Sequence, residues 1–187
     1  MTDLAPATAF GVAEPREQSF GTLSLRERPD LALASLALAE DPAPLPQPFG
    51  VTLPEPGRMA LGDGGLAAVW MAPRQWMLLG EGAADDDFAA CVVTAVPEAC
   101  VTEQTDGWVA IDLQSDDGAA PLARLLERMV NLRPEALTAG CATRTLLAHQ
   151  SVFVLRRAED LVTFLGPRSA AGSLWHAVAT AAQRLQG

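Results

Sequence analysis

The chain has 187 residues, 49% of them hydrophobic, which suffices to bury the core of one large domain or of two small halves packed as a unit. A formal net charge of −10 argues against nucleic acid and against an anionic membrane surface as partners, because both attract basic patches. All thirteen positive residues are arginine, and neither lysine nor tyrosine occurs. Schiff-base chemistry, a phosphate-loop lysine and a tyrosine general acid are therefore excluded.

The cysteines and the N-terminus indicate a cellular compartment. Cys91, Cys100 and Cys141 are odd in number and lack a C-x-x-C spacing, which is typical of reduced thiols rather than of a disulfide framework. The first basic residue is Arg16, so the charged start of a secretory signal is missing, and no apolar run approaches membrane-spanning length. These features predict a cytoplasmic protein.

The first elements in chain order are an arm, a strand and a proline-rich connection. Residues 1–22 lack sustained periodicity and predict a loose arm or a segment that orders on a partner. Residues 31–38 alternate leucine with small residues, which favours a strand with one buried face, although the alanine content also allows a helix. Alternating prolines over residues 42–48 require an extended segment, either a surface connection or a docking strip for a partner.

A hairpin and a short helix follow. The apolar runs 66–71 and 76–79 are joined through Pro73-Arg74-Gln75, a pattern typical of a hairpin. Three aspartates at 85–87 supply negative charge where a helix N-terminus favours it. Apolar residues at helical spacing then predict an amphipathic helix over 88–95, which ends before Pro97.

The second half repeats strands and helices. Val109, Ile111 and Leu113 form one face of a strand, and Asp112 lies on the opposite face, where solvent or a partner can satisfy it. Asp116-Asp117 can cap a helix whose apolar stripe runs over 122–130. The remaining predicted elements are strands at 143–148, 152–155 and 161–165 and a final helix from about Ser169.

This order of elements predicts an α+β fold. Strand-strand-helix-strand followed by strand-helix-strand-strand-strand-helix gives two helix-on-antiparallel-sheet halves. We therefore expect an N-terminal arm over residues 1–22 and a single α+β domain over 23–187, made of halves at about 23–104 and 105–187.

The titratable residues do not assemble into a recognisable catalytic or metal site. His149 and His176 have no second histidine or cysteine at ligand spacing, and a base role for either is less expected than a packing or surface role. Cys91 falls on the apolar face of its predicted helix, whereas Cys141 lies in a loop where it could be exposed and reactive. Residues 62–67 match G-x-G-x-x-A, but they lead into a strand and therefore predict a turn, not a dinucleotide site.

Arginine and tryptophan, the residue types that dominate interface hot spots, are the remaining prominent feature. At least two of the four tryptophans are expected in the core, because large aromatic side chains drive packing in any domain. The candidate interface residues are Trp70, Trp76, Trp175, Arg144 and Arg168, with Trp108 as a further candidate.

Several segments together resemble the gamma subunit family of heterotetrameric sarcosine oxidase. Their order and spacing carry the resemblance, which spans about residues 20 to 185. The segments are Trp70–Leu79, Ala110–Leu113, the 122–130 helix with Asn131–Pro134, Cys141–Leu146, Gly166–Ser169 and Leu174-Trp175.

The resemblance implies a fold similar to the folate-binding domains of the glycine cleavage T protein group. It also implies an assembly with alpha, beta and delta subunits that oxidatively demethylates sarcosine to glycine, with hydrogen peroxide as product and tetrahydrofolate as one-carbon acceptor. FAD, FMN, NAD and tetrahydrofolate are implied for the partner subunits, none for this chain, whose role is that of a non-catalytic companion.

Two alternatives of other classes stay open. One is a free-standing folate-dependent protein of the same fold, either an aminomethyltransferase or an iron–sulfur assembly factor. The assembly factors carry a lysine-glycine-cysteine-tyrosine motif ending in glutamine-glutamate, of which only Gly140-Cys141 occurs here, followed by Ala142. The other is a small-ligand binding module that uses a groove between the two halves.

Overall fold

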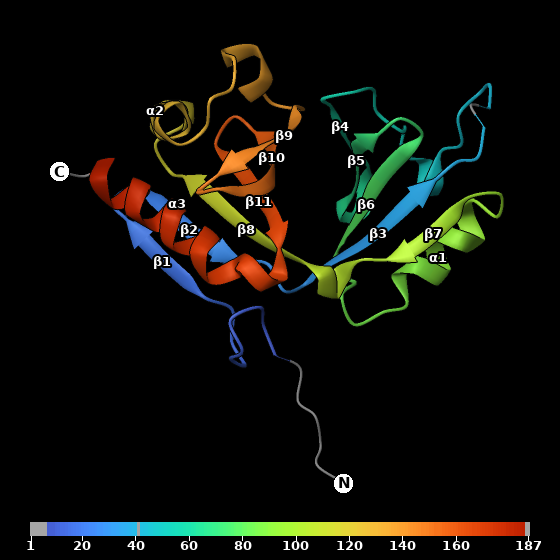
Figure 1. Cartoon of the computed structure of the whole chain (residues 1–187), viewed down its shortest axis with the longest axis horizontal. Coiled ribbons are helices and arrows are strands. Elements are labelled where there is room, and N and C mark those ends of the chain that lie inside the picture. Colours follow the sequence, from blue (N-terminus) through green and yellow to red (C-terminus); the bar gives the residue numbers. More distant parts are fainter. Residues whose placement is uncertain (1–6, 41, 186–187) are drawn as a thin grey trace, which may run out of the picture. The chain divides into compact units, whose positions relative to one another are not determined.

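The computed structural model describes residues 7–40 and 42–185, which form two compact units (Figure 1). Unit 1 comprises the N-terminal segment up to residue 29, residues 107–139 and the chain from residue 144 onward. Unit 2 comprises residues 30–106 and 140–143. Compared with the halves expected at 23–104 and 105–187, residues 23–29 belong to unit 1 and residues 140–143 belong to unit 2.

Unit 1 is a six-stranded sheet with two helices. The strand order is β1-β2-β8-β11-β10-β9, and the β1–β2, β2–β8, β8–β11 and β11–β10 pairs are antiparallel. The strands are β1 Glu17–Phe20, β2 Leu23–Glu27, β8 Trp108–Ser115, β9 Ala142–Leu147, β10 Gln150–Ala158 and β11 Leu161–Pro167. The helices are α2 Ala119–Met129 and α3 Ala171–Leu185.

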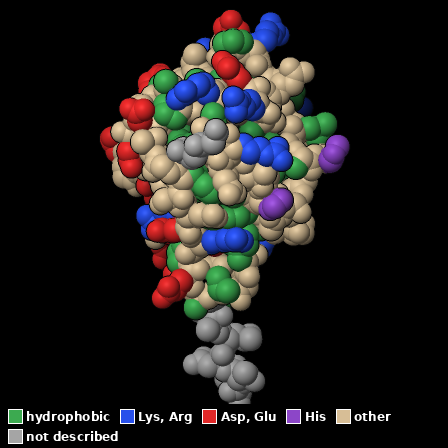
Figure 2. Space-filling model, turned by 90° about the vertical axis from the view of Figure 1, so that its left-hand side faces the viewer, with side chains coloured by type: hydrophobic (Ala, Val, Ile, Leu, Met, Phe, Trp, Pro, Cys, Tyr) green, Lys and Arg blue, Asp and Glu red, His purple; other side chains and the backbone are tan. Residues whose placement is uncertain are grey.

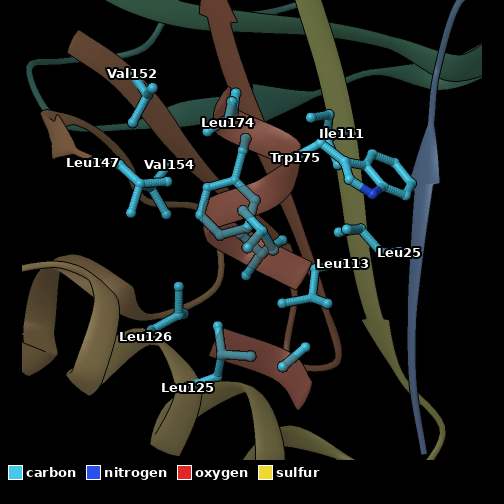
Figure 3. Packing of buried hydrophobic residues seen from close by; sticks show 14 of the residues in the cluster. Leu25, Ile111, Leu113, Leu125, Leu126, Leu147, Val152, Val154, Leu174 and Trp175 are labelled. Carbon is cyan, nitrogen blue, oxygen red and sulfur yellow. The ribbon is translucent and has the colours of Figure 1, made fainter. Parts of the chain in front are cut away.

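One face of this sheet and the apolar stripes of both helices make the core of unit 1. Ile111 and Leu113 of β8 point toward Leu125 and Leu126 of α2 and toward α3 (Figure 3). Period-two alternation in the strands and period-3.6 spacing in the helices place these residues on the facing surfaces. Trp175 of α3 is the largest fully buried side chain in the chain's described part.

Unit 2 is a five-stranded antiparallel sheet with one helix. The strand order is β4-β5-β6-β3-β7, and α1 (Phe88–Ala95) packs Phe88 and Val92 into the core with Leu36 and Leu78. The strands are β3 Leu31–Ala37, β4 Met59–Leu61, β5 Leu66–Ala72, β6 Gln75–Glu81 and β7 Cys100–Glu103. Single 3₁₀ turns occur at Pro48–Gly50, Asp63–Gly65, Thr105–Gly107, Pro134–Leu137 and Arg168–Ala170.

The α+β class with two helix-on-antiparallel-sheet layers is confirmed. The predicted strand over 31–38, the hairpin over 66–79 and the helix over 88–95 match β3, β5–β6 and α1. At the hairpin, Arg74 adopts a positive φ of 60° and completes the turn. The later strands and the final helix also lie within a few residues of their predicted bounds.

Two predictions are wrong, one for the N-terminal segment of unit 1 and one for the start of α2. The arm predicted over 1–22 contains a strand, because Glu17–Phe20 pairs with Leu23–Arg26; residues 1–6 of that arm lie outside the described part. Asp116-Asp117 does not cap α2, whose N-cap is Gly118 at φ 68° with no side-chain cap. The turn before α2 instead uses Ser115, whose hydroxyl accepts a hydrogen bond from the Asp117 backbone N–H at 3.2 Å.

Glycine permits close helix–strand contact in both units. A Cβ on Gly80 of β6 would lie 2.9 Å from the Phe88 ring of α1, and a Cβ on Gly166 of β11 would lie 2.9 Å from Leu174 of α3. Neither neighbour can retreat easily, because both are buried in their cores. The two strands therefore need glycine where their helices cross.

We predict that Gly166→Ala lowers the free energy of unfolding by about 1–3 kcal/mol, because the added methyl overpacks the α3 contact. Gly172→Ala in α3 is the matched control, since no atom lies within 4 Å of its Cβ position and alanine is the better helix former. Urea denaturation of both variants measures the difference. Equal stabilities would contradict the close-contact explanation.

Candidate functional site

The two histidines, for which the sequence favoured a packing or surface role, lie on different elements of unit 1. His149 occupies the exposed turn between β9 and β10 at φ 66°, and His176 lies on the exposed side of α3. In the described ranges 7–40 and 42–185, no group of three or more His, Cys, Asp or Glu side chains could hold a metal ion. The 62–67 segment forms a 3₁₀ turn that leads into β5, as predicted for a turn rather than a nucleotide site.

The two cysteine placements differ from the sequence-based expectation. Cys91 is exposed, not a core residue, because the buried stripe of α1 uses Phe88 and Val92. Cys141 is buried, not loop-exposed, since Gly140 and Ala142 hydrogen-bond to the segment around Arg58. The Arg58 Nη1 donates to the Cys141 Sγ at 3.4 Å.

Asp112 is the centre of a buried polar cluster. Its Oδ2 accepts from Arg28 Nη1 at 2.8 Å, and its Oδ1 accepts from the Thr163 hydroxyl on the neighbouring strand. The register explains the contact, because Thr163 is directly opposite Asp112 in the β8–β11 pair. The prediction that solvent or a partner satisfies Asp112 is therefore wrong; residues from β11 and from the end of β2 satisfy it.

A second buried carboxylate holds the N-terminal segment. Glu27 is 1% exposed, and its carboxylate oxygens accept from the backbone N–H of Ala9 at 2.8 Å and of Arg16 at 3.2 Å. Arg168, a predicted interface residue, donates to the carbonyls of Ala7 and Thr8 at 2.8 and 3.1 Å. These bonds hold Ala7–Ala9 and Arg16 against Glu27 and Arg168 of the same unit.

The four tryptophans divide between core and surface. Trp76 and Trp175 are 4% and 2% exposed, so the expectation that at least two tryptophans lie in the core is met. The Trp76 Nε1 donates to the Pro54 carbonyl at 2.8 Å, and the Trp175 ring packs edge-on against Phe10 with centroids 5.4 Å apart. Trp70 is half-buried against the α1 core. Of the predicted interface tryptophans, Trp70 and the further candidate Trp108 are therefore the two with accessible surface.

The edge strand β9 of the unit 1 sheet carries the exposed Arg144 and Leu146. Together with two aromatic residues of other strands, Trp108 of β8 and the buried Phe153 of β10, they form a group that we call the β9 patch. β9 is the last strand in the sheet order, and edge strands offer backbone groups to partners. The exposed Arg144 lies over the Phe153 ring at 5.8 Å, and the half-buried Trp108 lies 6.1 Å from the same ring. Leu146, on the same strand face as Arg144, is 69% exposed.

The charge distribution of the surface is uneven. Figure 2 shows the side on which α2 and α3 lie in Figure 1, where several arginine side chains gather near the middle and acidic side chains gather toward one edge. A chain with a net charge of −10 therefore still offers local positive surface for contacts. No helix in the described residues is long and apolar enough to cross a membrane.

No protein-family model and no curated protein matches the chain. Among solved structures, a chain of the heterotetrameric sarcosine oxidase from Corynebacterium sp. U-96, in complex with pyrrole 2-carboxylate, matches with a TM-score of 0.75 at 20% identity, over 91% of this chain and 88% of that one. The glycine cleavage system aminomethyltransferase T from Bartonella henselae matches with a TM-score of 0.55 at 19% identity over 86% of this chain. This chain covers 49% of that enzyme. The fold of this chain is therefore similar to that of the matched chain of the oxidase and to part of the aminomethyltransferase.

We predict that Asp112→Ala lowers the free energy of unfolding by about 3 kcal/mol, because it removes the carboxylate that the half-buried Arg28 guanidinium and the fully buried Thr163 hydroxyl share. Glu17→Gln is the control, since the Glu17–Arg26 pair has both side chains 61% exposed and contributes at most about 0.5 kcal/mol. Urea denaturation followed by tryptophan fluorescence compares the two. Similar losses for both variants would contradict the assigned role of Asp112.

Proposed function

We propose that this chain is the non-catalytic gamma subunit of a heterotetrameric sarcosine oxidase. The observation that carries the proposal is the structural match to a chain of such an oxidase over 91% of this chain and 88% of that one. Because nearly the whole length of both chains is aligned, the similarity is that of a whole subunit and not of one domain in a larger enzyme. The order and spacing of segments such as Trp70–Leu79 and Cys141–Leu146, which resemble that subunit family, support the same subunit.

In this proposal the chemistry belongs to the partner subunits. The complex oxidatively demethylates sarcosine to glycine in the cytoplasm, releases hydrogen peroxide and passes the one-carbon unit to tetrahydrofolate. FAD, FMN, NAD and tetrahydrofolate bind to the larger subunits. The separation of His149, His176 and Cys141 among different elements, two exposed and one buried, supports a companion role for this chain.

We assign the main contact with the alpha, beta or delta subunit to the β9 patch. Arginine and tryptophan are enriched at interface hot spots, and Leu146 is the most exposed large hydrophobic side chain of the described residues. The Arg144 guanidinium is already oriented, because its Nε donates to the Ser151 hydroxyl at 2.8 Å and its plane lies near Phe153. An ordered arginine loses less side-chain entropy when a partner binds.

A free-standing folate- or small-ligand-binding protein of the same fold is the alternative. It is favoured by the match to an aminomethyltransferase, which is an enzyme rather than a companion subunit. This chain covers about half of the length of that enzyme, so the enzyme's activity is not carried over to it. Tight folate binding by the isolated chain would support this alternative.

Co-expression with the genomically adjacent large subunits tests the proposal. We expect a tagged version of this chain to co-purify with them in stoichiometric amounts, with a flavin absorption spectrum and sarcosine-dependent peroxide release. A solitary, colourless chain in the presence of folded large subunits would refute the proposal. A folate titration would then examine the alternative.

We predict that Leu146→Arg combined with Arg144→Ala reduces co-purification of the large subunits at least about tenfold, since two hot-spot contacts are each worth about 1–2 kcal/mol. Leu61→Arg is the control, because Leu61 is also exposed, at 57%, on an edge strand, β4 of unit 2. Pull-down yield at equal expression is the measurement. Loss with Leu61→Arg alone would place the interface on unit 2.

A further inference from the structure

A small pocket lies inside unit 1 beside α2. Its volume is about 170 Å³, and it is bounded by α2, by the segment that follows α2 and by the end of β10. Ala123, Leu126, Leu132 and Leu137 supply apolar walls. This α2 pocket shares no lining residue with the β9 patch, so the proposed subunit contact does not explain it.

Arg156 is the buried charged residue of the pocket. It follows Val152 and Val154 at period two on β10, so it points to the helix-covered face of the sheet, and it is 3% exposed. Its Nη2 donates to the Glu159 carbonyl, but among the described residues no acceptor binds its Nε or Nη1. Three N–H groups of this buried guanidinium are thus left without an acceptor, and Arg156 is one of the residues that line the pocket.

The electrostatics of the site favour an incoming anion. Burial lowers the pKa of Arg156, and the nearby charges of Glu159 and Asp160 raise it in part, but an arginine remains charged at any physiological pH. A buried guanidinium without full hydrogen bonding is costly, and a bound carboxylate would recover much of that cost through charge-assisted bonds. The pocket floor thus suits a carboxylate.

Glu27 is a second buried charge in unit 1, and it differs from Arg156 because the chain itself supplies its hydrogen-bond partners. It lies on the same helix-covered face of the sheet, two positions after the core residue Leu25, just as Arg156 lies two positions after Val154. The chain folds Ala9 and Arg16 onto Glu27, and both carboxylate oxygens accept backbone N–H groups. By contrast, no segment of the described chain supplies a hydrogen-bond acceptor to the Arg156 Nε or Nη1.

The carboxylates that line the pocket indicate which charge a ligand carries at the end away from Arg156. Two exposed carboxylates, Glu127 and Glu159, line the same pocket and would repel a simple anion. They would attract a positive charge at the outer end of a molecule whose carboxylate reaches Arg156. A volume of 170 Å³ equals that of about five or six water molecules, which limits the ligand to a few non-hydrogen atoms.

We propose that the α2 pocket binds a free α-amino acid with a small apolar side chain. The carboxylate bonds to Arg156, the ammonium group faces Glu127 and Glu159, and the side chain contacts Leu126 and Leu132. The inference depends only on residues of unit 1 and holds whether or not the chain assembles with other subunits.

NMR titration of the isotope-labelled full chain tests binding. Glycine, alanine and valine are the probes, and propionate and ethylamine, which each lack one of the two charges, are the comparison ligands. We expect saturable shifts of the Arg156 Nε–H resonance and of α2 amides with at least one amino acid, at affinity at least about tenfold higher than for propionate or ethylamine, because each charged contact contributes about 1.5–3 kcal/mol. Equal binding of propionate, or no binding of any amino acid, would overturn the proposal.

Variants separate the ligand contacts from folding. Arg156→Met and Glu127→Gln should each weaken amino acid binding about tenfold or more, since each removes one charged partner. Ala123→Leu should block the pocket while leaving its charges and the helix propensity intact. Arg124→Met is the matched control, because Arg124 is exposed on α2 and does not line the pocket.

The outcomes are distinct from those of the subunit proposal. Loss of co-purification with Arg156→Met, together with no amino acid binding to the isolated chain, would assign the pocket to an acidic side chain of a partner and overturn the ligand proposal. Unchanged binding in Ala123→Leu would place the ligand elsewhere and overturn it as well. Normal assembly together with amino acid binding that Arg156→Met abolishes is the result we expect.

Discussion

The pairing of β8 with β2 on one side and β11 on the other determines the architecture of unit 1. It joins segments far apart in the sequence, as in the contact between Arg28 and Asp112, which are 84 positions apart. Closing such a loop costs chain entropy, and the cost is recovered when Ile111 and Leu113 are buried under α2 and α3. Without the β2–β8 register the Asp112 cluster could not form, because that register brings Arg28, the residue after β2, to Asp112 of β8.

The sequence predicted well what depends on local periodicity. The alternation in β8, the helical stripes of α2 and α3 and the proline-containing hairpin each fit one repeat over several residues, and each was found near its predicted bounds. The sequence-based prediction was wrong where pairing with another segment of the chain determines the secondary structure. β1 is too short and too polar to show alternation, and it is a strand only because β2 pairs with it.

The same contrast between local periodicity and contact with a distant segment explains which residues the sequence placed wrongly. Cys91 was placed in the core because a four-residue stripe defines a helix face only approximately, and the sheet selects Phe88 and Val92. Arg28 has no local signal, since its role comes from the strand opposite. Arg156 did carry a signal: a charged residue continued the alternation of Val152 and Val154, which places it on the covered face. The interruption of an apolar pattern by arginine was therefore the clue to the α2 pocket.

The exposed surface constrains how a companion subunit of this fold can bind its partners. The apolar stripes of α1, α2 and α3 are buried in the cores of their own units, so no described helix offers an apolar stripe for docking. The outer side of α2 carries Arg124, Glu127 and Arg128, which suit water or polar contacts. The exposed large hydrophobic side chains of the described residues are Leu146 on β9, Leu61 on β4, Val93 on α1, and Val12, Leu45 and Phe49 outside the strands. Of the two strands, β9 combines an exposed leucine, an oriented arginine and adjacent aromatic rings, whereas exposed apolar surface on β4 is limited to Leu61. The proposed contact through β9 is therefore consistent with the burial of all three helical stripes in the cores of the units.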